Sequence, residues 1–151
     1  MLGHSASRSG RSGMHLEDRV IIADDNPDLL SALAYMLRSD GIEVETAADG
    51  LSALQLCRRM RPGVVVLDLY MPHMSGLEVL DALRKDSDLS NVYAIMLSGM
   101  AGERSELASL APKADQHLIK PVDADLLVAT IEQGLQRRER RAGLLGRLER
   151  R

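Results

Sequence analysis

The sequence has few aromatic residues, with no Trp, no Phe and three Tyr among 151 residues. Proteins that bind single-stranded nucleic acids usually stack the bases on aromatic side chains. The near absence of such side chains therefore argues against that class of protein. It also predicts a hydrophobic core of aliphatic residues and Met, because 45% of the residues are hydrophobic.

Cysteines and long apolar segments are scarce as well. The single cysteine, Cys57, excludes an internal disulfide and suits a reducing cytoplasm, which is the location that we expect. No apolar run approaches the length of a membrane span, so we expect no membrane contact. Residues 1–18 are rich in Ser, Gly and Arg and have no apolar stretch, which predicts a disordered leader or an expression remnant rather than a secretory signal.

The net charge of −3 is unevenly distributed along the chain. Residues 137–151 contain seven Arg and two Glu, and we interpret them as a basic helical tail or linker. The remainder is acidic, and an acidic body binds nucleic acid poorly. We therefore expect no direct nucleic-acid binding. In the tail, Leu144, Leu145 and Leu148 form an apolar stripe that suits helix pairing.

Strand-like and helix-like patterns alternate five times along residues 19–136, which we interpret as one domain. Short apolar runs bounded by polar residues predict buried strands at residues 20–23, 42–47, 64–67, 92–97 and 116–119. Helical patterns separate them, with predicted caps at Asn26, Ser75 and Asp123 and a weaker helix around Ser105–Leu110. Strands separated by single helices predict an α/β fold, a (βα)5 doubly wound five-stranded parallel sheet.

Polar residues of distinct chemistry follow four of these strands. Asp24-Asp25 follow the first, Asp68 the third, Ser98 the fourth and Lys120 the fifth. Taken singly, each could be a helix cap, a strand-end acid or a surface charge. Together they should meet at the carboxyl edge of the sheet, where open α/β sheets bind ligands. Carboxylates are hard ligands for Mg²⁺, an ionised Asp can attack phosphorus, and Ser and Lys can bind phosphoryl oxygens.

These residues, with the stretch LDLYMPHMSGLEVL from Leu67 to Leu80, resemble the receiver domain of two-component response regulators, chemotaxis regulators included. The resemblance covers residues 19–136. It implies a flavodoxin-like receiver fold with strand order 2-1-3-4-5. It also implies phosphorylation-dependent signalling, in which a sensor histidine kinase or a histidine phosphotransfer protein donates a phosphoryl group to an aspartate. Binding to a downstream protein partner, or to a second copy in a phosphorylation-dependent homodimer, then changes.

The resemblance assigns roles to the acidic residues. Asp68 matches the phosphoryl acceptor of the family. Asp24 and Asp25 match the acidic pair that binds Mg²⁺, or Mn²⁺ as the alternative, together with the acceptor. The backbone carbonyl two residues after the acceptor, here that of Tyr70, completes the protein ligands in the family.

The resemblance also assigns the phosphoryl-binding and switch positions. Ser98 and Lys120 match the hydroxyl and the lysine that bind the phosphoryl group, and the family usually has a cis bond before the residue that matches Pro121. His117 stands where the family usually has a rotating Tyr or Phe. A switch role for His117 and a partly exposed edge-strand histidine both remain open.

Two other classes of protein remain as alternatives. A phosphohydrolase with an Asp nucleophile typically places a second Asp two residues further on, where this chain has Tyr70. A nucleotide- or flavin-binding domain would need a glycine-rich loop after the first strand, and Asp24-Asp25 would repel phosphate there. We therefore expect a signalling domain that catalyses only its own phosphotransfer and slow dephosphorylation, not an enzyme with an external substrate.

Overall fold

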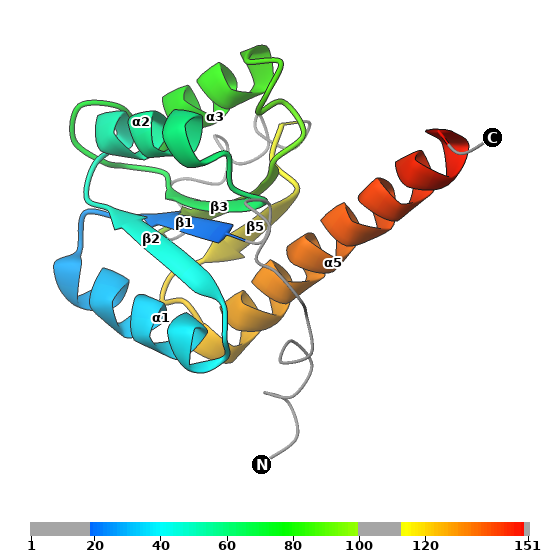
Figure 1. Cartoon of the computed structure of the whole chain (residues 1–151). Helices are drawn as coiled ribbons and strands as arrows, with labels where there is room; N and C mark the ends of the chain where they lie inside the picture. Colours follow the sequence, from blue (N-terminus) through cyan, green and yellow to red (C-terminus); the bar gives the residue numbers. More distant parts are fainter. Residues whose placement is uncertain (1–18, 100–112, 150–151) are drawn as a thin grey trace.

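The computed structural model describes residues 19–99 and 113–149, and its centre is a five-stranded parallel sheet (Figure 1). The strands follow one another in space in the order β2-β1-β3-β4-β5, and every neighbouring pair is parallel. Their bounds are β1 Arg19–Ala23, β2 Glu43–Ala47, β3 Val64–Asp68, β4 Tyr93–Ser98 and β5 Gln116–Ile119. The predicted fold class and strand order are confirmed.

The central strands are buried on both faces, as their continuous apolar runs predict. Every residue of β3 and β4 is buried, whereas the edge strand β5 has exposed or half-buried residues throughout. Two strands run one residue further than the sequence predicts, so that Asp68 closes β3 and Ser98 closes β4. The backbone hydrogen bonds of the sheet therefore fix the positions from which these two polar side chains extend.

Four helices connect or follow the strands in the described residues, namely α1 Pro27–Ser39, α2 Gly50–Met60, α3 Gly76–Lys85 and α5 Ala124–Glu149. Asn26 caps α1, and its side chain accepts hydrogen bonds from two backbone N–H groups of the first turn. Ser75 and Glu78 form the predicted capping box of α3. Asp123 accepts from the N–H groups of Asp125 and Leu126 and so caps α5. The helix predicted around Ser105–Leu110 lies outside the described residues, as does the predicted leader 1–18.

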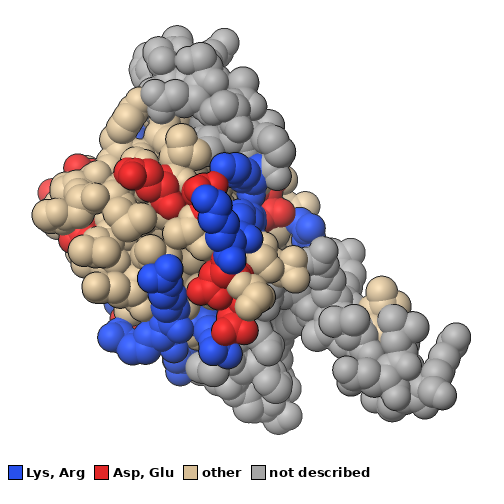
Figure 2. All heavy atoms as spheres, turned by 90° about the horizontal axis from the view of Figure 1, so that it is seen from above, with Lys and Arg blue, Asp and Glu red and all other residues tan. Residues whose placement is uncertain are grey.

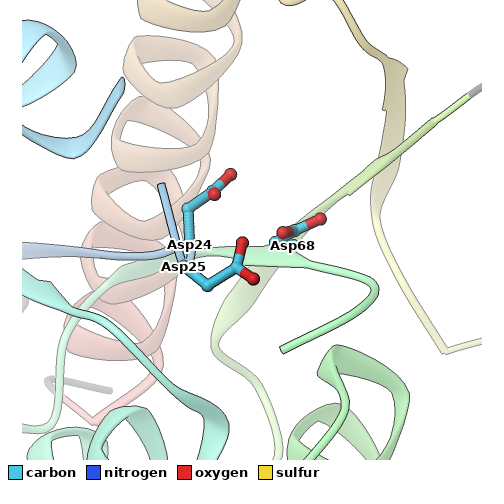
Figure 3. Close-up of side chains that lie close together, drawn as sticks. All are labelled: Asp24, Asp25 and Asp68. Atoms are coloured by element: carbon cyan, nitrogen blue, oxygen red, sulfur yellow. The ribbon is translucent and has the colours of Figure 1, made fainter. Parts of the chain in front are cut away.

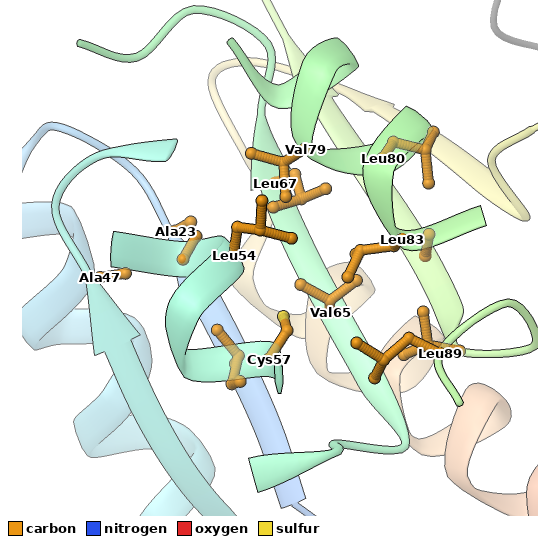
Figure 4. Packing of buried hydrophobic residues seen from close by; sticks show 14 of the residues in the cluster. Ala23, Ala47, Leu54, Cys57, Val65, Leu67, Val79, Leu80, Leu83 and Leu89 are labelled. Atoms are coloured by element: carbon orange, nitrogen blue, oxygen red, sulfur yellow. The ribbon is translucent and has the colours of Figure 1, made fainter. Parts of the chain in front are cut away.

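Two hydrophobic clusters, one on each face of the sheet, hold the helices in place. Figure 4 shows the first cluster, in which α2 and α3 pack on side chains such as Val65 and Leu67 of β3. The second packs α1 and α5 on the alternate residues, including Val64 and Val66. Burying each aliphatic side chain contributes roughly 1.5–3 kcal/mol. The cores are aliphatic and Met-containing as predicted, with Cys57 fully buried in the first.

One apolar residue of α2 is exposed. Leu54 and Cys57 are buried against the sheet, but Leu51 is 45% exposed. A position three residues before Leu54 lies at the edge of the buried stripe, so its side chain turns partly to solvent. Burial also raises the pKa of the Cys57 thiol to about 12, which keeps it protonated at neutral pH.

The outer face of α2 and α3 carries charges of both signs next to one another (Figure 2). The recorded ion pairs include Arg61 with Asp88 at 3.2 Å and Lys113 with Asp81 at 2.6 Å. The partners are more than a third exposed, so solvent screens these pairs and they add little stability. The face is therefore a solvated surface of mixed charge.

Helix α5 continues past the predicted end of the domain. It runs unbroken from Ala124 to Glu149, across the predicted boundary at residue 136, and its end projects from the body of the molecule (Figure 1). Leu127, Ile131 and Leu135 bury one side of its first half, whereas Leu144 is 57% exposed. The side chains of Leu145 and Leu148 lie outside the part of the chain that the structure describes. Among the described helices, none has the length and apolarity that crossing a bilayer requires.

Candidate functional site

The carboxyl ends of four strands bring the predicted site residues together. Asp24 and Asp25 directly follow β1, Asp68 ends β3, Ser98 ends β4 and Lys120 directly follows β5. The strands are parallel and in register, so that Asp68 lies beside Leu97 and Ser98 beside Ile119. The same edge of the sheet therefore carries all five side chains, as the sequence predicts.

Three carboxylates form the centre of this site (Figure 3). Each of Asp24, Asp25 and Asp68 has an oxygen within 4.8 Å of an oxygen of the other two. Asp24 is fully buried, Asp68 is 6% exposed and Asp25 is exposed to solvent. At this separation and an effective dielectric constant of about 20, two carboxylates repel each other by about 3 kcal/mol. The cluster therefore favours a bound cation, and its hard oxygen donors suit Mg²⁺ or Mn²⁺.

Lys120 is the one cation that the described residues place between the buried acids. Its Nζ lies 2.9 Å from Oδ2 of Asp24 and 3.1 Å from Oδ1 of Asp68. Burial lowers the pKa of Lys120, but its contacts with Asp24 and Asp68 outweigh burial and raise this pKa above its usual value. Lys120 therefore stays protonated, and one positive charge faces three acids.

Asp68 is a carboxyl with a strongly raised pKa. Burial and the negative charge of Asp24 raise its pKa to about 6, although the hydrogen bond from Lys120 acts in the opposite direction. The ionised form of Asp68 is therefore destabilised in the fold. A bound cation, or a covalent bond to one of its oxygens, would relieve this destabilisation. Perturbed groups of this kind cluster at functional sites.

Asp24 is held by backbone contacts as well as by Lys120. Its N–H donates to the carbonyl of Ala47, which extends the pairing of β1 with β2 by one residue. Its Oδ1 accepts from the N–H of Asn26, the cap of α1. Sheet and helix together thus orient the carboxylate.

Ser98 and His117 contribute buried polar atoms for which the described residues offer no hydrogen-bond partner. The hydroxyl of Ser98 is fully buried, and a buried unpaired polar group costs about 1–3 kcal/mol. Nε2 of His117 is also buried, and His117 lies beside Met96 on the sheet face that α2 and α3 cover. The half-buried position fits either interpretation of His117, and neither is tested by the structure.

The loop between β3 and α3, residues 69–75, shapes one side of the site. The N–H of Leu69 donates to Leu97 of β4 at 2.8 Å, and Tyr70 follows with half of its surface exposed. At the other end, the N–H of Gly76 donates to the carbonyl of Leu69, also at 2.8 Å. The Tyr70 carbonyl is thereby placed one peptide beyond a fixed point, which fits the role that the resemblance implies without testing it.

Two glycines border this loop, and the sequence prediction assigns no role to either of them. A Cβ on Gly50 would lie 2.0 Å from the carbonyl oxygen of Met74, and a Cβ on Gly76 would lie 2.1 Å from that of Asp68. Neither position could hold a side chain without moving the backbone. The glycines after Asp49 and Ser75 are visible in the sequence, but their contacts are not.

The predicted peptide geometry is also present, since the bond between Lys120 and Pro121 is cis. The N–H of Lys120 donates to the carbonyl of Ser98 at 2.7 Å, which fixes the start of the segment after β5. The lysine therefore leaves the sheet directly beside the end of β4.

Comparisons with known proteins point in one direction. A sequence model of the response regulator receiver domain matches residues 20–132. The transcriptional regulatory protein PrrA of Mycobacterium tuberculosis is 40% identical over 121 residues, which cover 80% of this chain and 51% of PrrA. The DNA-binding response regulator MtrA of Mycolicibacterium smegmatis is 34% identical over 124 residues, which cover 82% of this chain and 53% of MtrA. The chain thus spans about half the length of these relatives.

The solved structures include a similar fold at nearly full length. A CheY-like response regulator receiver domain protein from Methanospirillum hungatei superimposes with a TM-score of 0.74 at 28% identity. The superposition covers 82% of this chain and 98% of that one. The similarity therefore extends over the whole domain and not only over the motifs.

Proposed function

The chain belongs to the response regulator receiver domain family, and on this premise we propose that Asp68 is the residue that accepts the phosphoryl group. Members of the family are signalling phosphoacceptors of two-component systems, and this chain is one of them. No comparison supports the phosphohydrolase alternative. The observation that carries the assignment is the contact of Lys120 with Asp68 and Asp24 inside a cluster of three carboxylates.

The transfer is a displacement at phosphorus. A carboxylate oxygen of Asp68 forms the new P–O bond while the P–N bond of a donor phosphohistidine breaks and the imidazole leaves. Lys120 already touches Asp68, so its ammonium can stabilise the charge on the phosphoryl oxygens. The buried hydroxyl of Ser98 can donate to another of these oxygens, which would satisfy a group otherwise left without a partner in the described residues.

Receiver domains bind a divalent cation at their acidic cluster, and the donors present here fit one. We propose Mg²⁺, with Mn²⁺ as a substitute, held by Asp24, Asp25, Asp68 and the backbone carbonyl of Tyr70. When bound, the ion neutralises charge on the phosphoryl group. Asp25 is the exposed member of the cluster, so its carboxylate faces solvent.

Response regulator receivers act between histidine kinases and downstream effectors. We propose a sensor histidine kinase or histidine phosphotransfer protein as donor and a cytoplasmic location for the exchange. Ser98 and His117 are proposed to carry the change of state from the site to β4 and β5, after which a downstream protein or a second copy binds differently. The basic tail at residues 137–151 is proposed as the linker beyond the receiver.

Phosphorylation of the Asp68→Asn variant tests the assignment. With acetyl phosphate and Mg²⁺, the unchanged chain should incorporate label and the variant should incorporate none, because the amide is not a nucleophile. Asp81→Asn is the matched control, since Asp81 also contacts a lysine but lies on the exposed face of α3. Labelling of Asp68→Asn at the normal rate would remove Asp68 from the mechanism.

A further inference from the structure

We infer that Gly50, the first residue of α2, is a positioning residue for the phosphorylation site. Its missing side chain lets the loop of residues 69–75 close against α2, and this closure sets the backbone carbonyl of Tyr70. The inference rests on the proposed function, because it concerns the carbonyl that we propose as a metal ligand. No residue of α2 is among the proposed metal ligands, so Gly50 acts on the site only through the loop.

The contact between Gly50 and the loop leaves no room for a methyl group. A Cβ on Gly50 would lie 2.0 Å from the carbonyl oxygen, 2.6 Å from the carbonyl carbon and 2.7 Å from the Cβ of Met74. The first two atoms belong to the backbone, so rotating the Met74 side chain cannot relieve the overlap. Carbon and oxygen atoms normally stay about 3.3 Å apart, so the loop would have to move by about 1 Å.

The outer part of the loop also forms a hydrogen bond with Gly50. The N–H of Gly50 donates to the carbonyl of Pro72 at 3.3 Å, and the N–H of Met74 donates to the same carbonyl at 2.8 Å. The carbonyl of Pro72 therefore joins the start of α2 to the turn before α3. A shift of Met74 would move Pro72 with it.

The inner part of the loop cannot follow such a shift. Asp68 belongs to β3, and the N–H of Leu69 donates to Leu97 of the neighbouring strand. The carbonyl of Leu69 is held in turn by the N–H of Gly76. The displacement must therefore be absorbed between the fixed Leu69 and the moved Pro72, which is where the Tyr70 carbonyl lies.

Backbone conformation gives no separate reason for a glycine at position 50. Among the described glycines, only Gly41 has a positive φ, so alanine fits the backbone of Gly50. Alanine is also the better residue inside a helix, by about 1 kcal/mol. The approach of the loop is thus what excludes a side chain here.

Binding of Mg²⁺ alone, measured by calorimetry on the full chain, tests the inference. Mg²⁺ requires nearly ideal octahedral geometry, and changes in residues that orient its ligands typically cost about 10–100-fold in affinity. We expect Gly50→Ala to raise the Kd for Mg²⁺ at least about tenfold. The Kd for Ca²⁺ should rise less, because Ca²⁺ accepts longer and more variable ligand distances.

Two other glycines of the chain provide matched controls. A Cβ on Gly134 would lie 2.4 Å from the ring of Tyr93, whereas a Cβ on Gly143 would meet nothing within 4 Å. Both lie in α5, away from the site. Gly134→Ala should destabilise the fold, whereas Gly143→Ala should not, and neither change should alter the Kd for Mg²⁺.

The possible results separate the inference from the function on which it rests. An unchanged Kd in Gly50→Ala would overturn the inference alone. An equal loss in Gly50→Ala and Gly134→Ala, or an equal loss for Mg²⁺ and Ca²⁺, would reduce Gly50 to a structural residue and overturn it too. If the unchanged chain bound no Mg²⁺, the proposed metal site itself would fail.

The unchanged chain offers a second measurement that does not depend on a variant that folds. Since Gly50 donates to Pro72 in the loop, its amide resonance should shift when Mg²⁺ is added to the ¹⁵N-labelled chain. The shift should saturate with the Kd found by calorimetry. A Gly50 amide that stays unchanged at saturating Mg²⁺ would contradict the coupling.

Discussion

Each end of the sheet holds a cluster of acidic and basic side chains, but the two clusters balance charge in opposite ways. At the carboxyl end, Asp24, Asp25 and Asp68 face a single cation, Lys120. At the amino end, the single acid Asp115, just before β5, meets two guanidinium groups. The first cluster has an excess of negative charge and the second has none.

The amino-end cluster satisfies its polar atoms almost completely. Oδ2 of Asp115 accepts from Arg84 at 3.0 Å and from the N–H of Ala94 at 2.8 Å, and Oδ1 accepts from Arg137 at 2.9 Å. Arg84 also donates to three backbone carbonyls, those of Lys113, Ser90 and Val92. Arg137 lies over the ring of Tyr93, 5.5 Å from its centre. This cluster ties α3, β4, β5 and α5 together.

The difference distinguishes a reactive site from a structural one. Balanced charges with full hydrogen bonding stabilise a single arrangement and have no use for a further ligand. The carboxyl-end cluster has a raised pKa at Asp68 and a buried hydroxyl at Ser98 that no described residue pairs with. Binding of a cation or of a phosphoryl group at this cluster is therefore favourable.

Replacing the one cation of the carboxyl-end cluster should have the largest effect. We expect Lys120→Met to reduce the rate of phosphorylation by acetyl phosphate roughly 100- to 1000-fold, the usual cost of removing one charge-stabilising donor. Initial rates of labelling at saturating Mg²⁺ measure the effect. Lys113→Met, which removes an exposed partner of Asp81, should leave the rate unchanged. An unchanged rate in Lys120→Met would remove the lysine from the mechanism.

Removing the acid of the amino-end cluster should destabilise the fold without touching the site. Asp115→Ala leaves Arg84, whose side chain is 20% exposed, without its counter-charge and the N–H of Ala94 without an acceptor. We expect the free energy of unfolding in urea to fall by about 3 kcal/mol. Asp81→Ala breaks two exposed ion pairs, with Lys85 and Lys113, and should cost much less because solvent screens them. Equal losses in the two variants would mean that the amino-end cluster is only a surface network.

Removing an acid from the carboxyl-end cluster should have the opposite sign. The pKa of Asp68 rises from 3.8 to about 6 on folding, so the folded chain binds this proton more tightly than the unfolded chain. Without metal, the cost of ionising Asp68 is absent below pH 3.8, grows as pH rises and is complete above about pH 6. Asp68→Asn should therefore stabilise the metal-free fold by up to about 3 kcal/mol at pH 7.5.

Urea unfolding with EDTA at pH 7.5 and at pH 4 measures this difference. The advantage of Asp68→Asn should disappear at pH 4, and added Mg²⁺ should stabilise the unchanged chain more than the variant. A variant that is less stable at pH 7.5 would show that Asp68 is a structural acid like Asp115.

The smallest effect is expected at the exposed edge of the amino-end cluster. The side chain of Arg137 is 48% exposed, so its ion pair with Asp115 and its contact with Tyr93 are weakened by solvent. Arg137→Ala should lower the free energy of unfolding by less than about 1 kcal/mol, well below the effect of Asp115→Ala. A larger loss would assign the main anchor of the cluster to α5 rather than to α3.

Local sequence signals predict most of the fold because they act over short distances. The apolar run before Asp68 predicts a strand that is covered on both faces. Ser75 and Glu78 cap a helix through contacts between residues three positions apart. The caps at Asn26 and Asp123 are therefore predicted correctly. The cis bond before Pro121 is also present, but its prediction comes from the family resemblance and not from local signals. The helix expected around Ser105–Leu110 stays a prediction.

The candidate site is predicted less completely, because part of it depends on contacts between distant segments. The residue types at the strand ends predict the cluster, but the shared contact of Lys120 with Asp24 and Asp68 appears only in the structure. The exposure of Leu51 is likewise not visible in the periodic pattern, whereas the helical course of residues 137–149 agrees with the predicted helical tail. Periodicity describes one helix at a time and not what packs beside it.

The order of the strands along the chain, the acids and lysine at their ends, and hence the chemistry available to Asp68 are all visible in the amino-acid sequence. Which of these charges are balanced and which are not depends on the folded structure. Asp115 and Asp68 are the same residue type beside similar strands, yet one meets two guanidinium groups and the other meets two further acids. The physical reason is that electrostatic free energy depends on distances and burial across the fold, which neighbouring letters do not specify.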